Sequence, residues 1–272
     1  MKILKNEKIG CLGLGNMGTA IISGLASQLA PQQLYLFDQD KKKLLAAKKY
    51  KANLSSSAKS LAQKSTILIL AVKPKDIAPV LEEIKSELSN QLIVSLAAGI
   101  KINLFQKKLG KHLEIFRIMP NTPALVKEGM TVISPSPKAK PKSLKKIEFI
   151  FKQIGQTMIL PEKKLDAVTA LSGSGPAYVF TLIKAMTTGG QKMGLTSPEA
   201  LTLAIQTVLG SAKLLQVTKE KPEILRKKVT SPGGTTMEAL QVFKKFKLED
   251  IIVEGVKAAT KKSKLLGNPP KI

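Results

Sequence analysis

Glycines at positions 13, 15 and 18 are the residues whose spacing first suggests chemistry. They stand in the sequence Gly13-Leu-Gly-Asn-Met-Gly18, directly after the apolar run that begins at Ile9. A glycine turn between a strand and a helix lets the backbone approach a pyrophosphate, and the free N–H groups of the first helical turn can bind the anion. We therefore predict a phosphate-binding loop formed by Gly13, Leu14, Gly15, Asn16, Met17 and Gly18.

An acidic residue follows this loop at the distance expected for a dinucleotide site. Asp38 lies 20 residues after Gly18, at the end of a predicted strand at 34–37. In Rossmann folds a carboxylate at this place accepts a hydrogen bond from a ribose 2′-hydroxyl. Asp38 is therefore the predicted ribose ligand. The alternative is a glycine turn in an unrelated βαβ unit.

The first half of the chain alternates predicted strands and helices, which is typical of an α/β domain with a parallel sheet. The continuous apolar run at 67–72 and the buried segment at 92–96 are typical of strands covered on both faces, and a further strand is predicted at 113–119. Ligands of such sheets bind outside the carboxyl ends of the strands. We predict that the segments at the carboxyl ends of these strands complete the dinucleotide site, namely Ala71, Val72, Lys73 and Pro74, then Ala97, Ala98 and Gly99, then Asn121, Thr122 and Pro123.

From about residue 161 the predicted strands stop and helices follow. Helices are predicted at 162–171, 176–193, 197–215, 222–229, 237–246 and 248–266, with Ser197 capping the third. The segments 176–186 and 201–215 are apolar on most sides, so a monomer would expose much of this surface. We predict two domains, residues 1–161 and 162–272, with an oligomer interface in the second.

The composition excludes several kinds of catalytic site. Cys11 is the only cysteine and His112 the only histidine, expected in a strand and in a surface loop. A disulfide, a metal site and a Ser-His-Asp triad are therefore not predicted. No apolar run approaches the roughly 20 residues that span a bilayer, and the N-terminus leads straight into the first strand. We expect a soluble cytoplasmic protein without a signal peptide.

The net charge of +25 would attract nucleic acid and acidic membranes nonspecifically. The lysines are dispersed along predicted helices, however, and the sequence contains no tryptophan. Neither a stacking platform nor a nucleic-acid-binding module is recognisable. A solvated lysine-rich surface is the favoured interpretation. A basic nucleic-acid-binding protein is the alternative, which a salt-titrated DNA-binding measurement would identify.

Five segments, in order along nearly the whole chain, resemble those of pyrroline-5-carboxylate reductases. Besides the glycine loop they are Ala71-Val-Lys-Pro74, Met119-Pro-Asn-Thr-Pro-Ala124, Leu171-Ser-Gly-Ser-Gly-Pro-Ala-Tyr178 and Ser231-Pro-Gly-Gly-Thr-Thr236. The resemblance implies a Rossmann domain followed by a helical domain, and a dimer with interlocked helical domains that often assembles into a decamer. It also implies reduction of 1-pyrroline-5-carboxylate to L-proline by NADPH or NADH.

The resemblance assigns roles to residues near the end of the chain. Thr236 would be the catalytic hydroxyl facing the ring nitrogen, and Asn121 and Thr122 would lie near the nicotinamide. The predicted substrate-binding residues are Ser231, Gly233, Gly234, Thr235, Val229 and Glu162. Alone, the segment 231–236 is typical of an ordinary helix cap, because serine, glycine and threonine are common there. The other four segments favour the binding role.

Some positions depart from the family pattern. The carboxylate of Asp38 would repel a 2′-phosphate, which favours NADH unless Lys41 to Lys43 offset the charge. Ala58 stands where relatives often carry an asparagine that contacts the cofactor. Lys227 stands where relatives often carry an acid. We expect this difference to change substrate affinity but not the reaction.

The nearest rival is a β-hydroxyacid dehydrogenase, whose glycine loop is similar. Those enzymes place a catalytic lysine in the helix after a glycine-rich segment. Here the first lysine after Ser172-Gly-Ser-Gly175 is Lys184, which disfavours the rival.

Overall fold

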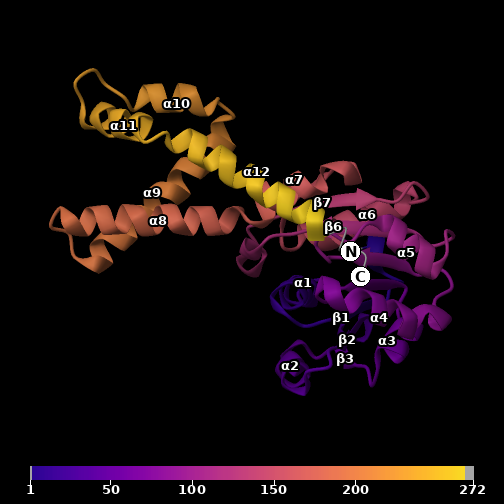
Figure 1. The fold of residues 1–272 in the computed structure, drawn as a ribbon. Helices are drawn as coiled ribbons and strands as arrows, with labels where there is room; N and C mark the ends of the chain where they lie inside the picture. Colours follow the sequence, from indigo (N-terminus) through magenta and orange to yellow (C-terminus); the bar gives the residue numbers. More distant parts are fainter. Residues whose placement is uncertain (1, 267–272) are drawn as a thin grey trace. The chain divides into compact units, whose positions relative to one another are not determined.

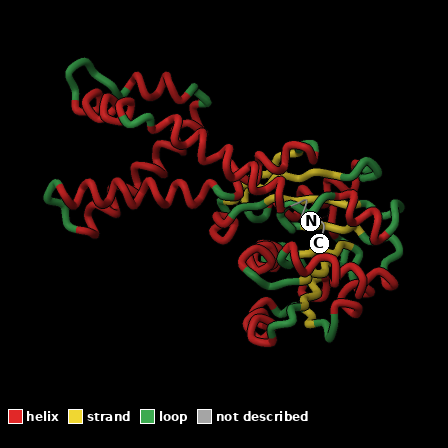
Figure 2. Tube along the Cα trace, in the orientation of Figure 1, coloured by secondary structure: helices red, strands yellow, loops and turns green. Residues whose placement is uncertain are grey.

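The computed structural model describes residues 2–266, which fall into two compact units. The first comprises the chain up to Ser174 together with the end of the last helix from Ala259, and the second comprises Gly175–Ala258. Figure 2 shows strands in the first unit and only helices and loops in the second. This division falls later than the predicted domain boundary at 161. Residues 267–272 of the predicted second domain lie outside the described residues.

The first unit is built on a sheet with the strand order β3-β2-β1-β4-β5-β6-β7-β8. Figure 1 labels β1, β2, β3, β6 and β7 of this sheet. Paired strands are parallel except β6 and β7. The strand order reverses between β1 and β4, which is where doubly wound sheets bind ligands. The predicted α/β class with a Rossmann-type sheet is confirmed. The strands are β1 (Ile9–Leu12), β2 (Leu34–Phe37), β3 (Asn53–Leu54), β4 (Ile67–Leu70), β5 (Leu92–Ser95), β6 (Ile115–Met119), β7 (Gly129–Pro135) and β8 (Gly155–Ile159).

Apolar side chains of each central strand pack alternately on the two faces of the sheet. In β4, Ile67 and Ile69 join one buried cluster, and Leu68 and Leu70 join the other. Because both faces are covered, these strands are apolar throughout, as predicted. Helices α1 (Asn16–Ala26), α2 (Lys41–Ala47) and α6 (Pro141–Lys152) contribute to the first cluster, and α3 (Ala58–Lys64), α4 (Pro74–Ile84) and α5 (Ile102–Leu109) to the second.

The helix predicted at 162–171 is wrong as a continuous α-helix. The chain forms a 3-10 turn at Glu162–Lys164, one turn of α7 (Leu165–Val168) and a π-helical turn at Thr169–Gly173. The backbone N–H of Ser174 donates to the carbonyl of Thr169 at 2.8 Å, which closes the wider turn. Serines and glycines at 172–175 are poor α-helix formers, so the α-helix is not held there. Such turns are frequent at functional sites.

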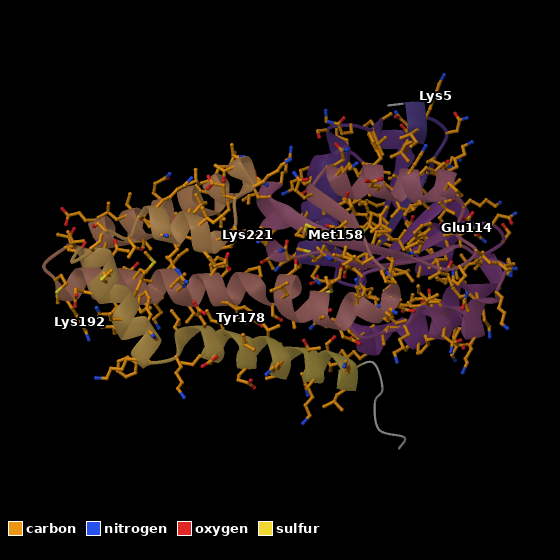
Figure 3. All side chains as sticks on the ribbon, turned by 90° about the horizontal axis from the view of Figure 1, so that it is seen from above. Lys5, Glu114, Met158, Tyr178, Lys192 and Lys221 are labelled. Atoms are coloured by element: carbon orange, nitrogen blue, oxygen red, sulfur yellow. The ribbon has the colours of Figure 1, made fainter. Side chains whose placement is uncertain are left out.

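The second unit contains α8 (Gly175–Lys192), α9 (Ser197–Thr218), α10 (Pro222–Lys228), α11 (Thr235–Lys245) and most of α12 (Leu248–Leu266). In Figure 3 the labelled Tyr178 and Lys192 lie toward opposite ends of α8. The predicted cap of α9 at Ser197 is wrong by one residue. Thr196 and Glu199 form a capping box, in which the N–H of Thr196 donates to Glu199 Oε2 at 2.7 Å.

Helix α9 exposes much apolar surface. Its buried residues are Ala200 and Ala204, whereas Leu209 is 59% exposed. By length and composition alone α9 could cross a bilayer, and 11% of its most apolar window is buried. Its sequence contains no long uninterrupted apolar run, because glutamine and threonine residues interrupt the helix. A helix of this kind needs an apolar partner.

Candidate active site

The glycine loop joins β1 to α1 as a tight turn. Gly13 has φ of +99°, and its N–H donates to the carbonyl of Phe37 at 2.8 Å. A Cβ on Gly18 would collide with the carbonyl oxygen of Gly13. The first turn of α1 can therefore lie against the loop only with glycine at 18, and the predicted strand, turn and helix are all present.

The N-terminus of α1 offers donors for an anion. Gly15 is its N-cap residue, and no side chain of residues 2–266 caps the helix. A Cβ built on Gly15 meets no described atom within 4 Å, so open space lies beside the backbone. Uncapped N–H groups at the positive end of a helix dipole suit a pyrophosphate. This geometry fits a dinucleotide cofactor.

A cavity of about 440 Å³ opens beside the loop. Predicted cofactor residues from three strand ends line it, namely Gly13, Gly15, Asp38, Ala71, Val72 and Lys73. Leu14, Asn16, Met17, Gly18 and Pro74 belong to the same segments. Ala97 and Ala98 follow β5, and Asn121 and Thr122 follow β6. Because β5 and β6 continue the sheet beyond β4, these four residues lie farther along the same edge.

Asp38 holds the glycine loop in place. Its Oδ2 accepts a hydrogen bond from the N–H of Leu14 at 2.7 Å, and its Oδ1 accepts one from Asp40 at 2.8 Å. Lys43 Nζ lies 3.7 Å from Oδ2. The carboxylate lines the cavity and retains lone pairs for a ribose. Its loop contact was missed because it spans 24 residues and depends on the pairing of β1 with β2.

Both polar atoms of the Asn121 side chain make hydrogen bonds within the first unit. Its Oδ1 accepts the N–H of Met130 at 2.8 Å, and its Nδ2 donates to the carbonyl of Ser172 at 3.2 Å. The side chain thus joins the loop after β6 to β7 and to the π-helical turn. The neighbouring Thr122 is exposed. A nicotinamide contact by either residue stays a prediction.

Cys11 and His112 lie where the sequence predicted them. Cys11 is fully buried in β1, and burial, followed by the charge of Asp38, raises the pKa of its thiol to about 12. The thiol therefore stays protonated at neutral pH and is a poor nucleophile. His112 is exposed in a turn.

The segment 231–236 leads into α11 in the second unit, and Thr235 and Thr236 are the first two residues of this helix. Gly233 has φ of +69°, and the N–H of Gly234, the N-cap residue, donates to the carbonyl of Ser231 at 3.0 Å. No described side chain caps α11, and Thr236 is half-buried in its first turn. Ser231 and Thr235 are exposed, as is Val229. The arrangement offers N–H groups and hydroxyls to a carboxylate.

Glu162, a predicted substrate ligand, is engaged within the first unit. Its Oε1 accepts the N–H of Ile102 at 2.8 Å and lies 3.2 Å from Nη1 of Arg117. Arg117, whose side chain is 5% exposed, was not predicted from the sequence to take part in the site. A signal was available, because arginine inside the apolar run 115–119 must find a carboxylate elsewhere in the fold.

Comparison with known proteins gives two family matches. Residues 162–266 match the family described as pyrroline-5-carboxylate reductase dimerisation. Residues 8–99 match the family described as NADP oxidoreductase coenzyme F420-dependent.

Similarity to individual proteins extends over almost the whole chain. It is 38% identical over 264 residues to a pyrroline-5-carboxylate reductase of Escherichia coli, covering 96% of this chain and 98% of the other. A pyrroline-5-carboxylate reductase structure from Coxiella burnetii has a TM-score of 0.90 at 34% identity, covering 96% and 99% of the chains. The Plasmodium falciparum pyrroline carboxylate reductase, solved with NADP bound, has a TM-score of 0.89 at 32% identity, covering 97% and 99%.

Proposed function

Because the chain belongs to the pyrroline-5-carboxylate reductase family, we propose that its own residues bind and orient a cyclic imine and a nicotinamide cofactor. The chain is an NAD(P)H-dependent oxidoreductase that reduces the C=N bond of 1-pyrroline-5-carboxylate to L-proline, the last step of proline biosynthesis. The observation that carries this function is 38% identity to a family member over 96% of the chain.

We assign the cofactor to the strand ends of the first unit. When bound, it supplies the hydride. The glycine loop and the N-terminus of α1 would hold the pyrophosphate, and Asp38 the ribose. The loops at 71–74 and 97–98, with Asn121 and Thr122, would line the rest of the cofactor site. The uncapped N-terminus of α1 and the cavity beside it support this assignment.

The substrate carboxylate is assigned to the N-terminus of α11. The backbone N–H groups of Gly233 and Thr235 and the hydroxyls of Ser231 and Thr235 would bind it, and Gly234 would leave room beside them. Thr236 would donate a hydrogen bond to the ring nitrogen, which keeps the C=N bond polarised. The uncapped helix start supports the assignment. A domain boundary at 161 remains part of the proposal, since the dimerisation family match begins at 162.

An assay of the full chain tests the function. With NADPH or NADH, addition of 1-pyrroline-5-carboxylate should consume the reduced cofactor and release proline. 3-Hydroxyisobutyrate with the oxidised cofactor serves as the control substrate. Oxidation of 3-hydroxyisobutyrate without reduction of 1-pyrroline-5-carboxylate would contradict the proposal and support the β-hydroxyacid dehydrogenase alternative.

Asp38 is predicted to bias the enzyme toward NADH. Replacing Asp38 with serine removes the charge that would repel a 2′-phosphate. Asp38→Ser should therefore raise the ratio of kcat/KM for NADPH to that for NADH. Because serine also weakens the bond to Leu14, both absolute efficiencies should fall.

The variant Asp38→Asn is the matched control for this prediction. Asparagine removes the charge but keeps an oxygen that can accept the Leu14 N–H. It should shift the cofactor ratio as serine does while losing less of either efficiency. An unchanged ratio in both variants would mean that Asp38 does not face the ribose.

A dimer held by the helical unit is expected. The exposed apolar side chains of α8 and α9 need an apolar partner, and residues 162–266 match a dimerisation family. Sedimentation at micromolar concentration should show a dimer or a larger assembly. Leu209→Asp should weaken it, whereas Lys5→Glu in the first unit should not. A parent protein that sediments as a folded monomer would refute this expectation.

We further propose assembly beyond the dimer into a decamer, a cytoplasmic location, and no specific nucleic-acid partner. Side-chain nitrogens are distributed around both units rather than gathered on one face (Figure 3), which supports a solvated basic surface. Nonspecific binding to DNA should weaken steeply with salt.

A further inference from the structure

A buried arginine in the first unit lies beside two carboxylates of the segment that follows β8. Arg117 of β6 is 5% exposed, and its Nη1 lies 3.2 Å from Glu162 and its Nη2 4.0 Å from Asp166. A buried guanidinium is tolerated only when carboxylates pair with it. Asp166 also accepts a hydrogen bond from Ser263 of α12 at 2.8 Å. The positions of both carboxylates are therefore fixed.

Glu162 also contacts the N-terminus of α5. Its Oε1 accepts the N–H of Ile102, the first residue of α5, at 2.8 Å. Lys101, the N-cap residue of α5, makes no side-chain cap bond. A carboxylate at a helix N-terminus satisfies an orphan donor and is favoured by the helix dipole. Glu162 thus caps α5 from a position 60 residues away in the sequence.

The helix start that Glu162 caps is also the end of the loop 96–101, which follows β5. The first part of this loop is held by Ser95, whose Oγ accepts the N–H of Ala97 at 3.3 Å. Beside its later part, a cavity of about 420 Å³ is lined by Gly99, Lys101, Arg117, Glu162, Lys163, Asp166 and Lys264. Within this part the N–H of Ile100 donates to the carbonyl of Ala97 at 3.4 Å, and the bond from Ile102 to Glu162 ties its end to the segment after β8.

We propose that Glu162 is a positioning residue that fixes the loop 96–101 for cofactor binding, with Arg117 holding its carboxylate in place. This inference rests on the proposed assignment of Ala97 and Ala98 to the cofactor. It gives Glu162 a role other than the substrate contact expected from the sequence. The bond between Ile102 and Glu162 also joins the 3-10 turn at Glu162–Lys164 to the end of the loop after β5.

Two variants separate the capping bond from the charge. Glu162→Ala removes both, and the loss of one charge-assisted bond should raise the dissociation constant of NADPH roughly tenfold. Glu162→Gln keeps an oxygen that can accept the Ile102 N–H, so its dissociation constant for NADPH should rise less. Fluorescence titration of the full chain with NADPH measures both constants. Amide exchange should also quicken at 96–102 in Glu162→Ala, without cofactor present.

Glu114→Ala is the matched control. Glu114, labelled in Figure 3, accepts the N–H of Lys140, the N-cap residue of α6, at 2.6 Å, so its carboxylate also bonds the start of a helix. Its loss should lower the melting temperature without changing NADPH affinity. Equal loss of affinity in Glu114→Ala and Glu162→Ala, or parental affinity in Glu162→Ala, would overturn the inference. A parent that binds NADPH but leaves 1-pyrroline-5-carboxylate unreduced would instead refute the proposed function alone.

Discussion

Gly15→Ala should lose most NADPH affinity while the protein stays folded. The backbone at Gly15 has φ of −72°, which alanine adopts freely, and a Cβ there meets no described atom within 4 Å. The melting temperature should therefore change little, with a cost within about 1 kcal/mol. A methyl group would, however, occupy the space through which the pyrophosphate approaches the helix. We expect a loss of at least about 100-fold in affinity, equivalent to about 2.7 kcal/mol.

Gly18→Ala provides the contrasting result. Its Cβ would collide with the backbone carbonyl of Gly13 and approach Cys11 Sγ to 3.3 Å, so the loop itself must shift. Unfolding free energy should fall by about 1–3 kcal/mol, and NADPH binding should fall with it. Thermal melts and NADPH titrations of the two variants distinguish ligand exclusion from loop distortion. Parental affinity in Gly15→Ala would remove the pyrophosphate from the N-terminus of α1.

The centre of the sheet could be predicted from the sequence because strands β1, β4 and β5 are buried at every position. Runs such as 67–70 are apolar at every position, and they end at segments that form loops. The N-cap of α9 was harder to predict, because the adjacent Thr196 and Ser197 are both suitable cap residues. Thr196 rather than Ser197 caps α9 because Glu199 stands at the spacing that completes its capping box. The π-helical turn at 169–173 has no comparable pattern in the sequence.

The cofactor loops could be predicted because their glycine spacing is local. The contacts that hold those loops are not local. Asp38 reaches Leu14 across 24 residues, and Glu162 reaches Ile102 across 60. Each depends on which strands become neighbours in the sheet, and a sequence pattern of short period carries no such information. An isolated arginine in an apolar strand indicates that a partner exists but not which carboxylate it is.

Chemistry at the substrate depends on few candidate groups. Cys11 is buried with a raised thiol pKa, and His112 is exposed in a turn. Reduction of an imine does not need a strong base, since a donor that polarises the nitrogen is enough. Thr236 lies in the first turn of α11, where the neighbouring N–H groups can bind the carboxylate of the same substrate.

Thr236→Ala should therefore lower kcat by roughly 10–100-fold, as expected for the loss of one transition-state hydrogen bond of about 1.5–3 kcal/mol. NADPH affinity should stay near the parental value, because the proposed cofactor site is formed by the glycine loop of the first unit. Thr236→Ser, which keeps the hydroxyl, is the matched control and should retain most of the rate. Turnover of Thr236→Ala within about twofold of the parent would remove this hydroxyl from the mechanism, since a loss that small is only about 0.4 kcal/mol. Loss of NADPH affinity in both variants would instead indicate that the segment 231–236 has a structural role.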